Sequence, residues 1–163
     1  MAFLLFLFAV PIGAIAQILL EKGPRTPERV VAAFLTWLNG VAGLMGVYAF
    51  LGHTIKADEV AESIGWRAGN PFQTEVAFAN LSLGALRLLS AWQRGNFWVA
   101  AAVARAIFLL GAALVHIKEL LQKGNCKPGN CGWVFVLDIV FPITDLGLLI
   151  GYQRLKRGER SSG

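Results

Sequence analysis

The sequence predicts an all-α integral membrane protein: a five-transmembrane-helix bundle with a polar interior and a short interfacial helix between the second and third spans. Three observations lead to this fold class. The chain of 163 residues is 56% hydrophobic and only 15% charged, which is too apolar for a soluble domain. Its apolar residues fall in five runs, each near the roughly 20 residues that cross a bilayer. Polar residues recur inside these runs at helical spacing, as in helices that face one another.

Five apolar runs are separated by short polar connectors. The first run, "MAFLLFLFAVPIGAIAQILL", lacks the basic start of a signal peptide, so we expect an uncleaved helix. The third and fourth runs are so close that they should form an antiparallel hairpin. We expect one transmembrane domain, residues 1–158, followed by a tail, residues 159–163, whose Ser-Ser-Gly end resembles a cloning remnant. The predicted spans are residues 2–20, 30–52, 71–92, 97–116 and 133–152.

The residues between the second and third spans, up to the end of the segment Glu62–Val76, contain two helix signals. The stretch "ADEVAESIG" predicts the short interfacial helix, which Gly65 should end. Further on, Asn70 is a good N-cap and Pro71 suits the first helical position. Gln73 could then reach back to close a capping box.

Basic residues predict the orientation, because cytoplasmic loops of membrane proteins are enriched in Lys and Arg. The first and third connectors and the tail hold eight of them, and the opposite side holds five. We therefore expect the N-terminus outside and the C-terminus in the cytoplasm, in the inner membrane of a prokaryote. The net charge of +5 suggests basic cytoplasmic loops, with the lipid bilayer as partner and no nucleic acid.

Both cysteines lie on the predicted outer side, in the loop sequence "GNCKPGNC". An oxidising compartment favours a disulfide between Cys126 and Cys131, closing a small turn. Redox catalysis is the weaker alternative, because the C-x4-C spacing differs from the C-x-x-C of thiol oxidoreductases.

Polar residues form one stripe on each of four spans, because positions seven or eleven apart share a helix face. Lipid does not solvate such stripes, so we expect them to face one another. Counting residues from the span ends gives two groups. An inner charge lock holds Arg87, Arg105, Asp145 and Asn39, and an outer ligand-binding or proton-binding cluster holds His53, Gln73, Glu75, Asn80, His116 and Asp138.

Each group also has a purely structural interpretation. Arg105 and Asp145 could form an ion pair that only fixes helix register, and Arg87 could extend to the cytoplasmic headgroups. The histidines could simply bond loops at the span ends. Gly40, Gly43 and Gly46 are most simply a close helix-packing face.

Several short motifs together resemble a family of small prokaryotic multi-pass membrane proteins of unknown function. They are "YAFLGHTIKADEVAESIGW", "GNPFQTEVAFANLSLGALRLL", "RGNFW", "FLLGAALVHI" and "PGNCGWVFVLDIVFPI". The resemblance spans residues 48–143. The sequence pattern of the family includes His53, the Pro-Phe-Gln run with Glu75, His116 and Asp138. In that family, the loop that corresponds to "GNCKPGNC" resembles Asn-x-x-Pro-Gly-Asn-x-Gly and has no cysteines. The resemblance implies no activity.

Three kinds of function remain open. The first, which we favour, is a polar intramembrane site that opens to the outside and binds or conducts a small solute, ion or proton; five spans are few for this, so a homo-oligomer is expected. The second is a membrane oxidoreductase with a metal or haem, whose ligands would come from His53, His116, Glu75 and Asp138. The third is an accessory or structural subunit. The sequence identifies no cofactor.

Overall fold

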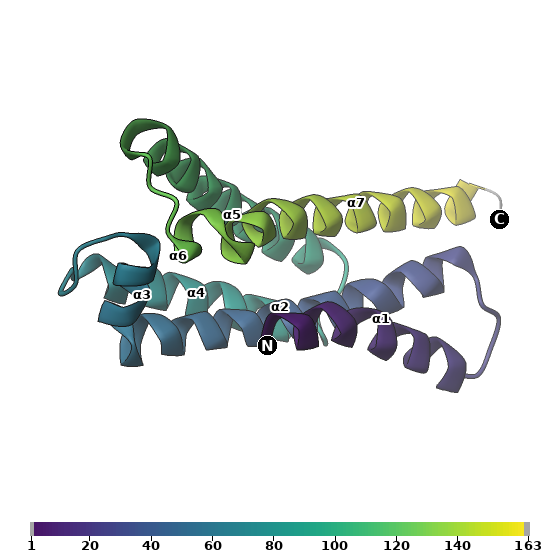
Figure 1. Ribbon diagram of the computed structural model, residues 1–163. Helices are drawn as coiled ribbons and strands as arrows, with labels where there is room; N and C mark the ends of the chain where they lie inside the picture. Colours follow the sequence, from purple (N-terminus) through teal and green to yellow (C-terminus); the bar gives the residue numbers. More distant parts are fainter. Residues whose placement is uncertain (1, 162–163) are drawn as a thin grey trace.

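A computed structural model gives the fold of residues 2–161, with side chains described for residues 8–158. In these residues the chain is helical and has no strand. The long helices are α1 (Ala2–Leu20), α2 (Pro27–Ile55), α4 (Phe72–Leu89), α5 (Asn96–Lys123) and α7 (Trp133–Ser161). Two short helices, α3 (Ala57–Ile64) and α6 (Pro128–Cys131), lie together at one end of the bundle, while the α1–α2 connector and the end of α7 lie at the other (Figure 1).

Three helical segments are long and apolar enough to cross a membrane: α2, α5 and Pro128–Gly158, which covers most of α7. The apolar part of α1 that is described in full, Phe8–Leu20, is shorter. Helix α4 has 18 residues and carries Glu75 and Arg87 in its first and last turns. The membrane character is therefore supported by three helices, and the predicted count of five spans is not confirmed.

The distribution of side chains is the reverse of that in a soluble protein. Large apolar side chains lie on the surface, for example Ile107, which is 69% exposed, and Leu114, which is 67% exposed. Charged and amide side chains are buried instead, and Arg87 and Asp145 are each 2% exposed. An extensive exposed apolar surface marks contact with a membrane or a partner, and a polar interior fits the stripes predicted from the sequence.

Helices α2 and α4 approach closely because glycine faces glycine. A Cβ atom added to Gly46 would lie 2.7 Å from the Gly84 Cα, and one added to Gly84 would lie 2.9 Å from the Gly43 carbonyl oxygen. Small residues allow such backbone approach in membrane helices. The predicted packing face is thus confirmed for Gly43 and Gly46, whereas Gly40 has open space around it.

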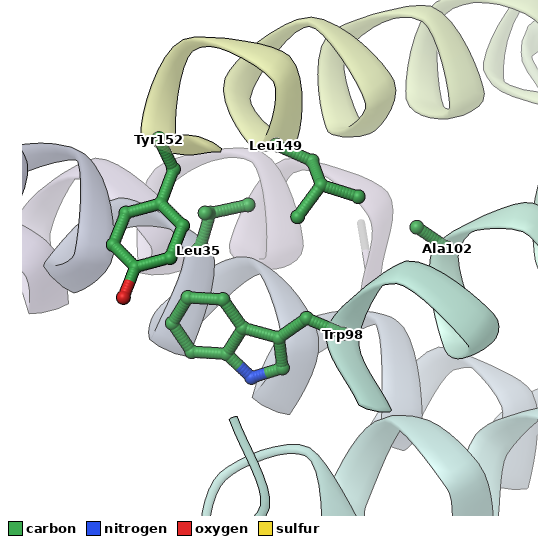
Figure 2. Packing of buried hydrophobic residues seen from close by; sticks show 5 residues of the cluster. All are labelled: Leu35, Trp98, Ala102, Leu149 and Tyr152. Carbon is green, nitrogen blue, oxygen red and sulfur yellow. The ribbon is translucent and has the colours of Figure 1, made fainter. Parts of the chain in front are cut away.

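The buried apolar cluster lies nearer the opposite end of the bundle from α3 and α6. Figure 2 shows the Trp98 ring of α5 against Leu35 of α2 and Tyr152 of α7. The Trp98 and Tyr152 rings are 5.3 Å apart between centroids. The Trp98 indole donates to the Ser90 carbonyl oxygen at 2.7 Å, which ties α5 to the end of α4. This contact closes the hairpin predicted for the third and fourth spans.

The segment between α2 and α4 largely follows the sequence prediction. Helix α3 is present and ends at Gly65, whose φ of 92° suits glycine. The Asn70 side chain accepts a hydrogen bond from the Phe72 backbone N–H at 3.0 Å, as expected of a capping side chain. The residue directly before α4 is Pro71, however, which was predicted as the first residue of the helix. The prediction of a capping box is wrong, because the Gln73 side chain contacts His53 on α2 instead.

The bounds of four long helices differ from the predicted spans, and α2 extends beyond residues 30–52 at both ends. Helix α4 ends at Leu89 and not at residue 92, because a turn follows at residues 90–92. Helices α5 and α7 continue past the predicted ends, to Lys123 and Ser161. The predicted tail is therefore helical as far as Ser161, while residues 162 and 163 lie outside the described residues.

Candidate functional site

The inner charge group is assembled by one arginine. Arg87 on α4 donates to Asn39 Oδ1 on α2 at 2.6 Å and to Asp145 Oδ1 on α7 at 3.3 Å, and it pairs with the second carboxylate oxygen of Asp145 as well. All three side chains are buried. The structure therefore corrects two predictions: Arg87 does not extend to the headgroups, and Asp145 pairs with Arg87 and not with Arg105.

Arg105 on α5 is left without a direct partner. It is 5% exposed, and its Nε and Nη1 atoms have no hydrogen-bond partner among the described residues. Its guanidinium lies 5.9 Å from the ring centroid of Phe141. Arg105 is within electrostatic reach of Arg87, Asp145 and Asp138, and among the described residues it forms no ion pair with either carboxylate.

The outer cluster forms two separate groups. In the first, His53 Nδ1 on α2 lies 2.5 Å from Gln73 Oε1 on α4. In the second, His116 on α5 contacts Asp138 on α7, with 3.6 Å between His116 Nε2 and Asp138 Oδ2. No hydrogen bond between the described residues joins the two groups, so each histidine has a polar partner of its own.

Two other members of the predicted outer cluster lie apart from both groups. Glu75 is exposed on α4. Asn80 is buried, and its amide donates to the Val76 carbonyl oxygen of its own helix at 3.0 Å. Neither residue therefore helps to hold a histidine.

Asn130 of α6 is a central residue that the sequence analysis missed. Its amide nitrogen donates to the carbonyl oxygens of Asn125 at 2.7 Å and His116 at 3.2 Å. Its amide oxygen lies 2.7 Å from His116 Nδ1. The repeated Gly-Asn of the loop "GNCKPGNC", next to a helix that ends in a histidine, was the available signal.

The contacts of Asn130 decide how the His116 ring is protonated. Because the amide nitrogen faces two carbonyl oxygens, the amide oxygen must face the ring. His116 Nδ1 therefore carries a hydrogen and donates it. In the neutral ring Nε2 is then a bare acceptor, and it faces Asp138 Oδ2. The contact becomes attractive when one of the two groups, His116 Nε2 or the Asp138 carboxyl, carries a proton that it can share with the other.

The metal and haem alternatives are not favoured by this geometry. Within the described residues no three side chains of His, Cys, Asp and Glu come close enough together to hold a metal ion. The predicted ligands His53, His116, Glu75 and Asp138 are divided between two places and an exposed position.

Both cysteines are free thiols, and the predicted disulfide is not formed. Cys131 lies in α6 and its thiol is 3.4 Å from the Asn125 carbonyl oxygen. A hydrogen bond with Cys131 raises the pKa of the exposed Cys126 thiol, and partial desolvation acts in the same direction. The two sulfur atoms are thus neighbours, although no bond joins them.

Comparison with known proteins gives one finding. The chain matches the model of the Family of unknown function (DUF6790) over residues 1–158. It belongs to this family, which confirms the resemblance to a family of unknown function. No curated protein and no solved structure was found to match the chain.

Proposed function

We propose that this member of DUF6790 is a multi-pass membrane protein that binds and passes protons through its polar interior. The observation that carries the proposal is the His116–Asp138 pair, buried between α5 and α7 with 3.6 Å between nitrogen and oxygen. That distance is about half an ångström beyond a hydrogen bond. A small shift of either side chain, or one water molecule, would let a proton pass between them.

Further ionisable groups continue inward from this pair. Arg105 lies within electrostatic reach of Asp138 and Asp145, and Asp145 pairs with Arg87. A proton on Asp138 removes a negative charge that attracts Arg105. The unpaired guanidinium is then drawn toward Asp145, and it returns when the proton leaves. Ionisable residues inside membrane segments commonly mark such routes.

The orientation and location are part of the same proposal. Positive-inside bias places α3, α6 and the His116 end outside, and the basic end of α7 in the cytoplasm of a prokaryote. In that orientation the pair opens toward the outer side. A homo-oligomer would supply additional helices around the route, and an oxidising outer compartment would close the Cys126–Cys131 pair.

Proton flux into liposomes tests the proposal. Purified protein is reconstituted with a pH-sensitive dye inside, and a potassium diffusion potential drives protons. We expect the wild-type rate to exceed that of empty liposomes, and Asp138→Asn to lower it at least about tenfold, the scale of a lost proton-transfer group. Glu75→Gln is the matched control, because it removes an exposed carboxylate on α4. A wild-type rate equal to that of empty liposomes, or equal rates for Asp138→Asn and wild type, refutes the proposal.

A second candidate, a structural role, is favoured by one observation. Arg87, Asn39 and Asp145 form a buried hydrogen-bonded group that links three helices. If the entire polar interior acts in this way, the protein is an accessory subunit. Asp138→Asn should then lower the melting temperature, and the liposomes should show no proton flux above the empty control.

A further inference from the structure

A second site lies outside the polar interior, at the end of the bundle where α3 and α6 lie. An open hollow of about 480 Å³ separates the α3–α4 loop from the last turns of α5. This volume is in the range of small-molecule sites, roughly 300–1,000 Å³. The hollow is lined by Gly65, Trp66, Arg67, Asn70, Phe72, Val115, Glu119 and Lys123. None of these belongs to the proposed proton route, so the inference is independent of it.

The charges in the hollow are of both signs. The Arg67 guanidinium is exposed and has no hydrogen-bond or ion-pair partner among the described residues. Across the hollow, Glu119 accepts from Lys123 at 2.7 Å. A ligand with a separate negative and positive group would therefore meet a free guanidinium on one wall. On the other it would meet the Glu119 carboxylate, which its positive group would share with the exposed Lys123 or take over from it.

The apolar part of the hollow continues onto the outside of the bundle. The Trp66 and Phe72 rings lie 6.3 Å apart, and tryptophan is enriched where membrane meets water. Phe72 is 48% exposed and Val115 is 43% exposed. Beyond them, toward the middle of the helices, Phe78 on α4 and Leu114 on α5 are also exposed. An acyl chain that starts at Phe72 and Val115 would thus find further apolar side chains exposed on the same two helices.

We propose that the hollow binds one phospholipid whose headgroup carries both a phosphate and a primary ammonium. Arg67 binds the phosphate, because a guanidinium matches two phosphate oxygens at once. Glu119 binds the ammonium, and the acyl chains lie over Phe72 and Val115. The headgroup of phosphatidylglycerol has the phosphate but ends in a neutral glycerol, so it offers Glu119 no positive partner. The charge pattern therefore selects the zwitterionic lipid.

Native mass spectrometry of the full chain in detergent tests this inference. The probes are phosphatidylethanolamine, phosphatidylglycerol and free phosphoethanolamine. We expect phosphatidylethanolamine to be retained best, and Arg67→Gln to lower its retention about tenfold, the loss expected for one charge-assisted contact. Lys118→Gln is the control, since it removes an exposed cation of α5 outside the hollow and should leave retention unchanged. Glu119→Gln should abolish the preference over phosphatidylglycerol.

Several results would overturn the inference. Equal retention of the two lipids by the wild type removes the headgroup assignment. Equal retention by Arg67→Gln and Lys118→Gln removes the site. Binding of free phosphoethanolamine as tight as that of the lipid makes the ligand a soluble molecule and not a membrane lipid. Melting curves of each variant confirm that the protein is folded, and none of these readouts depends on proton flux.

Discussion

Arg87 and Asp145 form a buried ion pair between α4 and α7 across 58 residues of sequence. Among the described residues, α4 and α7 do not pack directly on each other. The long arginine side chain therefore joins them, beside α2, where Asn39 accepts another of its hydrogen bonds. The pair fixes the position of α7 relative to the α2–α4 layer.

Removing one member of this pair should cost more stability than removing both. Asp145→Leu leaves the Arg87 charge buried without compensation, which costs about 3–5 kcal/mol. The double variant Arg87→Met with Asp145→Leu should recover most of the loss. Thermal or denaturant unfolding in detergent measures the four members of the cycle. The same cycle for Arg105 and Asp145 is the control, and its coupling free energy should be smaller than that of Arg87 and Asp145. A larger coupling free energy for Arg105 would mean that Arg105, and not Arg87, is the partner of Asp145.

Sequence alone predicted which polar residues face inward, because a helical stripe fixes a direction. Asn39, Gln73, Arg87, Arg105 and Asp145 are all buried. It did not predict which of them meet. Counting residues from the predicted span ends placed Arg105 at the same depth as Asp145. That count assumes helices that are parallel and equal in length. Helices α4, α5 and α7 end elsewhere than predicted, and tilt and rotation follow from packing that one sequence does not reveal.

The contact between His53 and Gln73 illustrates the same limit. Local signals on α4 predicted that Gln73 would close a capping box, and these signals contain nothing about α2. Because Gly46 and Gly84 let α2 approach α4, a histidine comes within 2.5 Å of that glutamine. Tertiary contact therefore overrides a local preference, whereas the hydrogen bond from the Phe72 N–H to the Asn70 side chain, which needs only its own loop, is formed.

The glycine contact between α2 and α4 should not tolerate a methyl group. Gly46→Ala places a Cβ 2.7 Å from both the Gly84 Cα and the Asn80 carbonyl oxygen, and we expect a loss of about 1–3 kcal/mol. Gly40→Ala is the matched control on the same helix, where nothing lies within 4 Å. Unfolding in detergent compares the two. Equal stability of both variants would show that the helices are not held this closely.

Asn130 should hold the α5–α7 connection in place. Asn130→Ala removes its bonds to His116 and Asn125 and leaves the buried His116 Nδ1 without a partner, at a cost of about 1–3 kcal/mol. We expect faster amide hydrogen exchange over residues 124–132. Lys127→Ala, at an exposed position of the same loop, should leave exchange unchanged. Exchange that is the same in both variants would contradict this role.

Asn130→Ala should also reduce the proton flux proposed above, although Asn130 transfers no proton. The amide fixes the hydrogen of His116 on Nδ1 and so presents Nε2 to Asp138. Without it, the ring can carry its hydrogen on either nitrogen or rotate away. Asn130→Asp is informative, because a carboxylate oxygen also accepts from Nδ1 and should preserve more flux than alanine. Equal flux in the two variants would mean that Asn130 acts through folding alone.

Cys126 reports the orientation of the chain, because its thiol is exposed in the loop between α5 and α7. We use Cys131→Ala, which prevents a disulfide, and an impermeant maleimide on intact cells. If α3 and α6 face outward, Cys126 is labelled without permeabilisation. A cysteine appended after Gly163 in a cysteine-free chain should be labelled only after the cells are permeabilised. The opposite pattern would invert the topology and the disulfide proposal with it.

The same thiol gives a chemical check on the Cys126–Cys131 contact. Hydrogen bonding with Cys131 raises the pKa of Cys126, so at neutral pH less of the reactive thiolate is present. In reduced, purified protein, Cys131→Ala should lower that pKa and speed the labelling of Cys126. The rate profile should shift to lower pH, since the thiolate then forms sooner as the pH rises. An unchanged profile would mean that the sulfur atoms do not meet, and would leave no geometric basis for a disulfide.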